Sequence, residues 1–289
     1  FRGPTKPYMV LFRILARFPF LRTIYVQELV PPAERIHPKR LSDRITQLHT
    51  VTTTPHGGPY LERVYPSGLL PQQRHLFPGV WRLAPAGYAA LDQASVLLAG
   101  NPEATTQLYH GLMAAETLAS IEIGLHGRDI RFASWRDIYD FTKKIPGKLK
   151  AGSVGIMPDS QPFAFIYPDQ TARFFVLEAE RMNTPARFRS KVQAYREIQR
   201  AKSYVSDWGI PSLLVLVVAA NEHQMRRMMK VVQEIYPEGT SQFLFQTVGA
   251  LGYPYKTPPP LKELVAAPWY RVGYVPFDLT DPGRQDQKE

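Results

Sequence analysis

The chain of 289 residues contains no cysteine, which removes several classes of function at once. Disulfide bonds, thiolate metal sites and cysteine nucleophiles are all excluded. Long hydrophobic runs are absent too. The longest apolar stretch, Ile210 to Ala220, is too short to cross a bilayer, and no segment resembles a signal peptide. We therefore expect a soluble, cytoplasmic protein with no membrane partner.

Two catalytic signatures are also missing. Without a glycine-rich phosphate loop, the sequence does not predict ATP-driven chemistry. The seven histidines, at positions 37, 49, 56, 75, 110, 126 and 223, include no His-hydrophobe-His pair. Relaxases that attack DNA with a tyrosine usually bind their metal through such a pair, so nothing here supports Tyr195 or Tyr204 as a nucleophile. His110 stands alone on a predicted helix, where histidine more often packs or donates a hydrogen bond.

Positive charge is in excess and is concentrated at one end of the chain. The 35 lysines and arginines outnumber the 25 acidic residues, which gives a formal charge of +10. From Phe1 to Leu91 there are 12 basic residues against 4 acidic ones, a net charge of +8. A basic N-terminal module predicts an anionic partner, with nucleic acid as the first candidate.

The first third of the chain carries three helical patterns, then two strand patterns and a short helix. Three helices followed by a β-hairpin is the order of a winged helix-turn-helix domain, whose third helix lies in the major groove of DNA. Leu41, Ile45 and Leu48 give this third helix a buried stripe. The predicted helices span residues 8–18, 23–29, 38–49 and 84–91, and the predicted strands span residues 60–65 and 79–83.

Polar and basic side chains of this module are candidates for contact with double-stranded DNA, because such side chains bind phosphates and base edges. A different interpretation is a solvated helix face on a winged helix that binds another protein. The concentrated positive charge favours DNA. We predict contacts from Lys39, Arg40, Arg44 and Gln47 on the third helix, and from Arg63 and Arg74 on or near the wing.

Helix and strand patterns alternate through the remainder of the chain, which predicts an α/β core with a mixed sheet. Lys143 to Lys150 forms a basic loop that is either solvated or in contact with a phosphate backbone. We predict an α+β/α/β fold with domains at residues 1–92 and 93–257 and a proline-rich extension at 258–289. Further helices are predicted at residues 105–125, 184–203 and 221–235, and strands at 129–135, 162–167, 172–180, 213–219 and 242–247.

The apolar segment from Phe174 to Leu177 runs directly into two carboxylates. A strand has a period of two, so Glu178 and Glu180 share one face. Asp159 precedes Glu178 by 19 residues, and the predicted hairpin between them brings the two together. Carboxylate oxygens suit Mg²⁺ or Mn²⁺. The sequence therefore predicts a metal site made of Asp159, Glu178 and Glu180.

The helix after this strand carries Arg187, Lys191 and Tyr195 on one face, at positions i, i+4 and i+8. Lys191 is the residue we expect to neutralise charge in a transition state. An alternative is that the acids serve the fold alone, because acids at a strand end commonly pair with nearby arginines. The available partners are Arg173, Arg181, Arg187 and Arg189.

Pro158-Asp159, followed by a strand that ends Glu178-Ala179-Glu180, resembles the PD-(D/E)XK pattern of restriction-endonuclease-like nucleases. The resemblance implies a restriction-endonuclease-like fold for the second domain, with metal-dependent hydrolysis of a phosphodiester. Glu180 departs from the pattern, since most members have lysine there. Some members tolerate glutamate or recruit a lysine from the next helix, and Lys191 fits that role.

Further features over most of the chain point to a second resemblance. They are Leu83-x-Pro85-x-Gly87, His110 with Leu112, Pro158-Asp159, Phe175-x-x-Glu178-x-Glu180-Arg181, and the basic helix with Arg187, Lys191 and Tyr195. Together they are similar to the replication-relaxation family of plasmid and mobile-element proteins. That likeness implies a role in plasmid replication or DNA relaxation, with replication or transfer proteins as further partners.

Three functions stay open on the sequence. In the first, a winged helix delivers a nuclease domain that nicks or cleaves DNA with Mg²⁺ or Mn²⁺. In the second, the nuclease-like domain is inactive and the protein is a DNA-binding accessory or regulator. The third is a protein scaffold, which leaves the charge asymmetry without a role.

Overall fold

The computed structural model describes residues 4–18, 20–91, 108–181, 184–253, 255–283 and 287–288. The chain forms two compact units. Unit 1 comprises Phe1–Ile123 and Leu251–Pro260, and unit 2 comprises Gly124–Ala250 and Leu261–Glu289. Both mix helices and strands, in agreement with the predicted α+β class. Among the described residues, no helix combines the length and apolar character that a membrane crossing requires.

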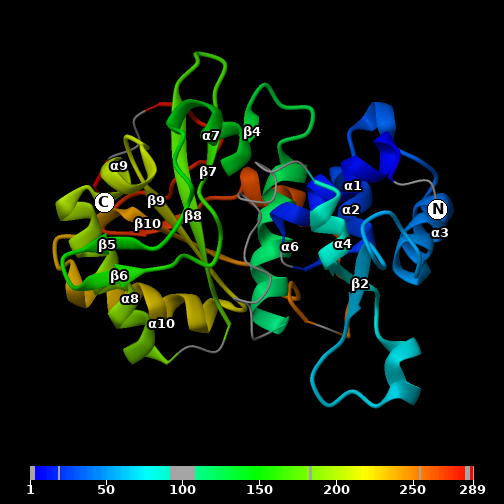
Figure 1. Ribbon diagram of the computed structural model, residues 1–289. Helices are drawn as coiled ribbons and strands as arrows, with labels where there is room; N and C mark the ends of the chain where they lie inside the picture. The colour runs from blue at the N-terminus through cyan, green and yellow to red at the C-terminus, as the bar shows by residue number, and fades with distance from the viewer. Residues whose placement is uncertain are drawn as a thin grey trace. The chain divides into compact units, whose positions relative to one another are not determined.

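Unit 1 contains a three-stranded antiparallel sheet with the strand order β1-β3-β2. Its N-terminal helices are the ones coloured from blue to cyan (Figure 1). Trp81 in the central strand pairs with Leu21 on one side and with Arg63 on the other. The predicted helices and strands of the first third lie close to their expected positions. The elements are α1 (Lys6–Arg17), β1 (Leu21–Arg22), α2 (Thr23–Leu29), η1 (Pro32–Glu34), α3 (Pro38–Thr50), β2 (Leu61–Val64), η2 (Pro71–Leu76), β3 (Val80–Leu83) and α4 (Pro85–Ala89).

The local sequence explains where α3 begins and which face it buries. Its first residue is proline, which tolerates the first helical position, and the His37 side chain accepts a hydrogen bond from the backbone N–H of Lys39. Leu41, Ile45 and Leu48 are fully buried, as their spacing predicts. The opposite face is left to polar and charged residues.

Unit 1 also includes α6 (Leu108–Gly124) as far as Ile123. The buried Glu116 forms an ion pair with the buried Arg22 and accepts a hydrogen bond from the backbone N–H of Gly252 at 2.7 Å. Arg22 in turn donates to the carbonyl of Tyr253 at 2.5 Å. Burial lowers the pKa of Arg22 to about 10, so the guanidinium stays charged at neutral pH. The pair thus ties three distant segments together.

Unit 2 is built on a six-stranded mixed sheet with the order β11-β10-β9-β8-β7-β4. Strands β8, β9 and β10 are parallel, and the outer strands on both sides are antiparallel to their neighbours. The elements are β4 (Arg131–Ala133), α7 (Trp135–Thr142), β5 (Leu149–Ala151), β6 (Val154–Ile156), β7 (Phe163–Ile166), β8 (Ala172–Glu180), α8 (Pro185–Ala201), α9 (Ser203–Trp208), β9 (Leu214–Ala219), α10 (Glu222–Ile235), β10 (Thr240–Thr247), η3 (Lys262–Val265) and β11 (Tyr270–Val272).

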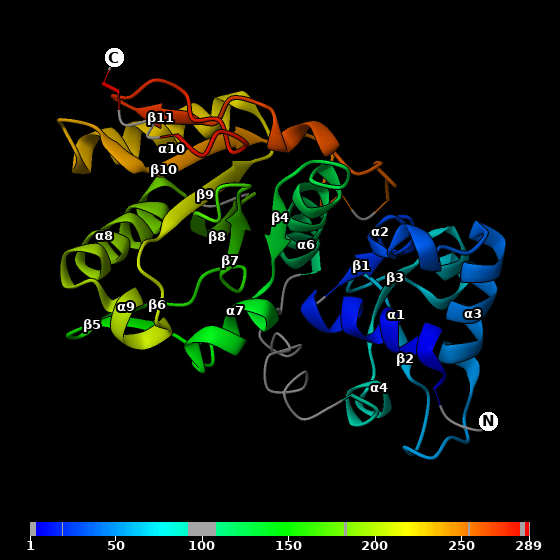
Figure 2. The same cartoon turned by 90° about the horizontal axis from the view of Figure 1, so that it is seen from above.

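Helices α8 and α10 lie side by side against this sheet (Figure 2). Phe188 and Tyr195 of α8 contact Phe245 and Phe243 of β10, with ring centroids 6.5 and 5.9 Å apart. These contacts show that α8 packs on one face of the sheet. The side chains on that side of α8 therefore point toward the sheet.

Several details of unit 2 differ from the sequence prediction. The strand expected at 129–135 ends at Ala133, and Trp135 instead begins α7, where Ser134 and Asp137 form a capping box. The helix expected to reach 203 ends at Ala201, because Lys202 adopts a left-handed conformation with φ 50°. A new helix, α9, follows it.

The predicted domain limits also fall differently along the chain. The expected boundary between residues 92 and 93 lies outside the described residues, and α6 clusters with unit 1. The expected extension 258–289 is divided between the units. Its part in unit 2 supplies β11, an edge strand of the main sheet.

Candidate metal centre

Strand β8 presents two buried carboxylates at its C-terminal end. Glu178 and Glu180 are 1% and 0% exposed and lie opposite Val217 and Ala219 of the parallel neighbour β9. Their spacing of two places both on one face of the sheet, as the sequence predicts. This face is the one that α8 covers.

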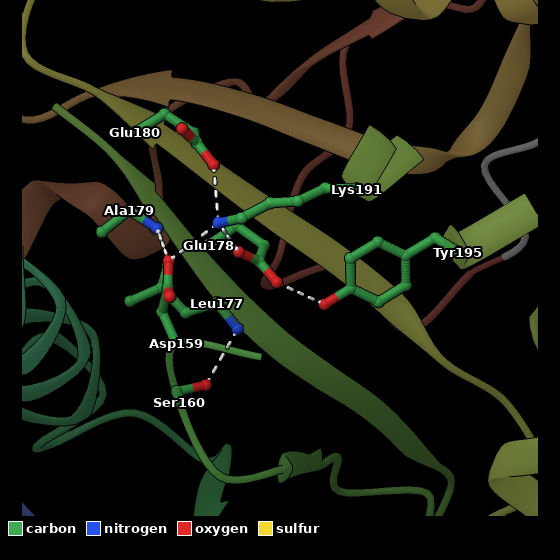
Figure 3. Close-up of polar contacts among 8 residues, drawn as sticks. All are labelled: Asp159, Ser160, Leu177, Glu178, Ala179, Glu180, Lys191 and Tyr195. Atoms are coloured by element: carbon green, nitrogen blue, oxygen red, sulfur yellow. Dashed lines mark hydrogen bonds and ion pairs between the residues drawn. The ribbon is translucent and has the colours of Figure 1, made fainter. Parts of the chain in front are cut away.

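Asp159 lies beside these glutamates because its carboxylate binds the edge of β8 where β7 no longer pairs with it. Pairing between β7 and β8 stops at Phe163 and Phe175, so the N–H groups farther along β8 have no strand partner on that side. The Asp159 carboxylate accepts the N–H of Ala179 at 2.9 Å, and the Ser160 hydroxyl accepts the N–H of Leu177 at 2.9 Å (Figure 3). These side chains replace strand carbonyls, which fixes Asp159 beside the glutamates.

Helix α8 supplies a cation and a phenol to the acids. It begins at Pro185, after Thr184 caps the N–H of Arg187. The Lys191 ammonium lies 2.5 Å from Glu178 Oε2, 2.8 Å from Glu180 Oε1 and 3.4 Å from Asp159 Oδ2. The Tyr195 hydroxyl donates to Glu178 Oε1 at 2.6 Å (Figure 3). One lysine thus contacts all three carboxylates.

Two of the arginines considered as partners for these acids are engaged elsewhere. Arg173 donates to the backbone carbonyls of Asp281, Pro282 and Gly283. Arg189 pairs with Glu234 on α10. Lys191, in contrast, contacts all three acids.

Burial and mutual repulsion set the protonation of the cluster. Burial, followed by the nearby Asp159 charge, raises the pKa of Glu178 well above its ordinary value, although Lys191 and Tyr195 oppose the shift. Burial alone lowers the pKa of Lys191, but the three carboxylates outweigh it and raise that pKa. Burial and Glu178 raise the pKa of Tyr195, so the phenol stays neutral and donates.

The donor set fits a divalent cation. One oxygen from each of Asp159, Glu178 and Glu180 lies within 4.8 Å of the others, and hard oxygen ligands at this density suit Mg²⁺ or Mn²⁺. Three carboxylates face one ammonium, so these four groups carry a net charge of −2 when all are ionised. The side chains of Asp159 and Lys191 are 15% and 17% exposed, which opens the cluster to solvent on their side.

The predicted DNA-binding residues lie in unit 1 and differ in how free they are. Lys39 and Arg40 are exposed at the start of α3. The Arg44 guanidinium lies 5.9 Å from the ring of Tyr8, and Gln47 accepts a hydrogen bond from the same tyrosine's hydroxyl. These contacts order Arg44 and Gln47 while leaving both with accessible surface.

The two arginines of the predicted wing have different surroundings. Arg63 donates to the carbonyl of Phe77 at 2.7 Å and lies over the rings of Tyr65 and Trp81. Its guanidinium is therefore engaged in contacts within unit 1. Arg74 is exposed and lies 5.0 Å from the ring of Tyr65. Arg74 is thus better placed than Arg63 to meet a phosphate.

Two positions complete the comparison of sequence and structure. His110 is half-buried on α6 in unit 1, whereas the acidic cluster belongs to unit 2. Ser160 was not identified from the sequence, and its position directly after Asp159 was the only available signal.

Comparison of the chain with protein-family models, curated proteins and solved structures finds no match.

Proposed function

We propose that the chain is a DNA-binding protein of plasmid or mobile-element replication or DNA relaxation. Unit 1 would act as a winged helix on double-stranded DNA, and unit 2 would act as a restriction-endonuclease-like domain that nicks or cleaves it with Mg²⁺ or Mn²⁺. The observation that carries this proposal is the convergence of Asp159, Glu178 and Glu180 around Lys191.

The surrounding fold supports the nuclease assignment. The two glutamates lie at the end of a central strand of a mixed sheet, Asp159 is bound to the edge of that strand, and the lysine comes from the helix that follows it. The Lys191 ammonium lies 2.8 Å from the Glu180 carboxylate, so it can supply the positive charge that the pattern usually places at this position. This arrangement accounts for glutamate at a position where the PD-(D/E)XK pattern has lysine.

Each side chain of the cluster has a separate role in the proposed reaction. Asp159, Glu178 and Glu180 would hold a divalent ion, which when bound polarises a phosphate and acidifies a water molecule. The N–H of Ala179 orients Asp159, and the Tyr195 hydroxyl orients Glu178. Lys191 stays cationic and partly exposed, so it can stabilise the negative charge that develops on a phosphate.

Incubation with supercoiled plasmid tests the nuclease proposal. We expect open-circular or linear product when Mg²⁺ or Mn²⁺ is present, and none when the metal is chelated. A preparation that binds the plasmid but leaves it supercoiled with either metal would contradict catalysis.

A second candidate function is supported by one specific contact. The Lys191 ammonium already binds an oxygen of all three carboxylates, so the cluster is held together without a metal. A buried ion cluster of this kind can be structural, in a DNA-binding accessory whose nuclease-like unit is inactive. In that case tight, salt-dependent DNA binding persists when Glu178 and Glu180 are replaced by glutamine, and no nicking is observed.

Reversal of charge on α3 tests the assignment of its exposed face. Changing both Arg40 and Arg44 to glutamate should weaken duplex binding at least roughly tenfold and lower the salt slope by about two, because two phosphate contacts are lost. Fluorescence anisotropy at several salt concentrations measures both quantities. The control changes Arg227 and Lys230, which are exposed on α10, to glutamate. Equal affinities for the two double variants would remove α3 from the DNA-binding surface.

The raised pKa of Glu178 gives metal binding a defined pH dependence. At a pH below that pKa, an incoming cation has to displace the Glu178 proton, because only the carboxylate is a ligand. Affinity for Mn²⁺ should therefore rise with pH until Glu178 is ionised and then level off, with proton release below that point. Calorimetric titration in buffers of different ionisation enthalpy measures the released protons. Affinity that is flat or falls over this range would contradict the assignment.

A further inference from the structure

The loop between α7 and β5 is basic, yet its backbone is firmly held. The indole N–H of Trp135 donates to the carbonyl of Lys144 at 3.0 Å, and that of Trp208 donates to the carbonyl of Gly147 at 3.2 Å. Both tryptophans are 1% exposed, and their rings meet edge to face with centroids 6.1 Å apart. Two buried side chains from different helices thus anchor one surface loop.

The side chains of this loop are left to solvent. Lys143, Lys144 and Lys148 of the loop are exposed, and so is Lys150 in β5. Two acidic groups contact this segment: Asp140 lies 3.8 Å from Lys143 on the surface, and Asp207 accepts hydrogen bonds from the backbone N–H of Lys150 and from Ser206. A loop whose backbone is already fixed loses little conformational entropy on binding. With its ammonium groups pointing outward, it is pre-organised to bind a chain of phosphates.

Apolar surface is exposed on the same segment. Phe141, in the last turn of α7, is 83% exposed, and Ile145 in the loop is 50% exposed. Most of the described large apolar side chains of unit 2 are buried, so an exposed ring in the same short segment as four exposed lysines suits a ligand with both flat apolar and anionic parts. Unpaired bases on a sugar-phosphate backbone have this combination, and proteins bind them through aromatic side chains in basic grooves.

The chain connects this segment directly to the acidic cluster. The hairpin of β5 and β6 follows the loop, packs on α8, and leads through the exposed Met157 to Asp159. Loop, hairpin and cluster all belong to unit 2. A strand of DNA held at the loop would therefore bind the same unit as the candidate metal centre.

We propose that residues 141–150, from the last turn of α7 through the anchored basic loop into β5, form a second DNA-binding element that is specific for single-stranded DNA. The lysines bind phosphates, and Phe141 stacks on an unpaired base. DNA as the ligand class rests on the proposed function, whereas the element requires neither catalysis nor the winged helix. It would hold the strand that nicking or relaxation leaves unpaired.

Binding of a labelled single-stranded oligonucleotide to the full chain tests this proposal. Changing Lys143, Lys144 and Lys148 together to glutamine should lower affinity at least tenfold and reduce the salt slope by about two. Changing Phe141 to alanine should weaken binding roughly tenfold with an unchanged slope, because stacking is not ionic. The exposed Arg227, Lys230 and Lys262, changed together to glutamine, form the charge-matched control, which should bind as the wild type does.

The outcomes separate this proposal from the nuclease proposal. All the replaced residues are exposed, so melting temperatures should match the wild type and a loss of affinity reports binding. If the triple lysine variant binds single-stranded DNA as tightly as the control, or if both lose affinity equally, the proposal is overturned. If only duplex binding falls, or if the Phe141→Ala variant keeps full affinity, stacking on a single strand is overturned. Plasmid nicking does not enter this test.

Discussion

Replacing Lys191 with alanine should lower the melting temperature of the metal-free protein by roughly 10 °C. The change removes the Lys191 ammonium, which contacts Asp159, Glu178 and Glu180, and leaves three carboxylates crowded in a largely buried place. Breaking a buried ion pair from one side costs about 3 to 5 kcal/mol, because the remaining charge stays desolvated. Mn²⁺ or Mg²⁺ should restore much of this loss, since a bound ligand stabilises the folded state.

Thermal unfolding with and without metal measures both parts of this expectation. Lys230→Ala, on the exposed face of α10, is the matched control and should change little in either condition. Adding Glu178→Gln to Lys191→Ala should recover stability without metal, because one of the crowded charges is gone. If Lys191→Ala melts at the wild-type temperature, the cluster does not depend on its lysine. If metal gives no recovery, the carboxylates do not form a cation site.

Loss of a single metal ligand should reduce plasmid nicking by at least roughly a hundredfold. Substitution of groups that only orient a ligand costs 10- to 100-fold, so removing a ligand should cost more. Asp159→Asn and Glu178→Gln keep the size of each side chain and remove its charge. Duplex affinity should not change, because the predicted duplex-binding residues all belong to unit 1.

Initial rates of nicking at saturating Mn²⁺, together with duplex anisotropy, measure this split between cleavage and binding. Glu238→Gln, an exposed carboxylate of the same unit, is the control and should nick as the wild type does. Equal rates for all three variants would assign any observed cleavage to a contaminant or to another site. A parallel loss of nicking and of duplex binding would instead indicate that the substitutions damage the fold.

The parts of the site that depend on the period of a strand or a helix could be predicted from the sequence. A strand period of two places Glu178 and Glu180 together, and the helical spacing places Lys191 and Tyr195 on the side of α8 that faces them. The β-hairpin of residues 163 to 180 has a clear pattern, so the approach of Asp159 could also be predicted. These relations are local or one hairpin apart.

Other features depend on contacts that no local pattern encodes. Ser160 is significant only because the pairing of β7 and β8 stops early and leaves the N–H of Leu177 to be satisfied. The ion pair of Arg22 and Glu116 joins segments far apart in the sequence, and each residue alone resembles an ordinary surface charge. Strand β11 was not predicted from the sequence, and it becomes part of the sheet only through its pairing with β10.

The direct test of the central claim, that Asp159, Glu178 and Glu180 form a divalent-metal site, is a titration of the full chain with Mn²⁺ followed by electron paramagnetic resonance. The free-ion signal should decrease with one tight site per chain, and Glu178→Gln and Glu180→Gln should each abolish that site. The Lys191→Ala variant should retain it. A free-ion signal that follows the added Mn²⁺ for the wild type as it does for the two variants would show that Lys191 is the resident cation and that the cluster is structural.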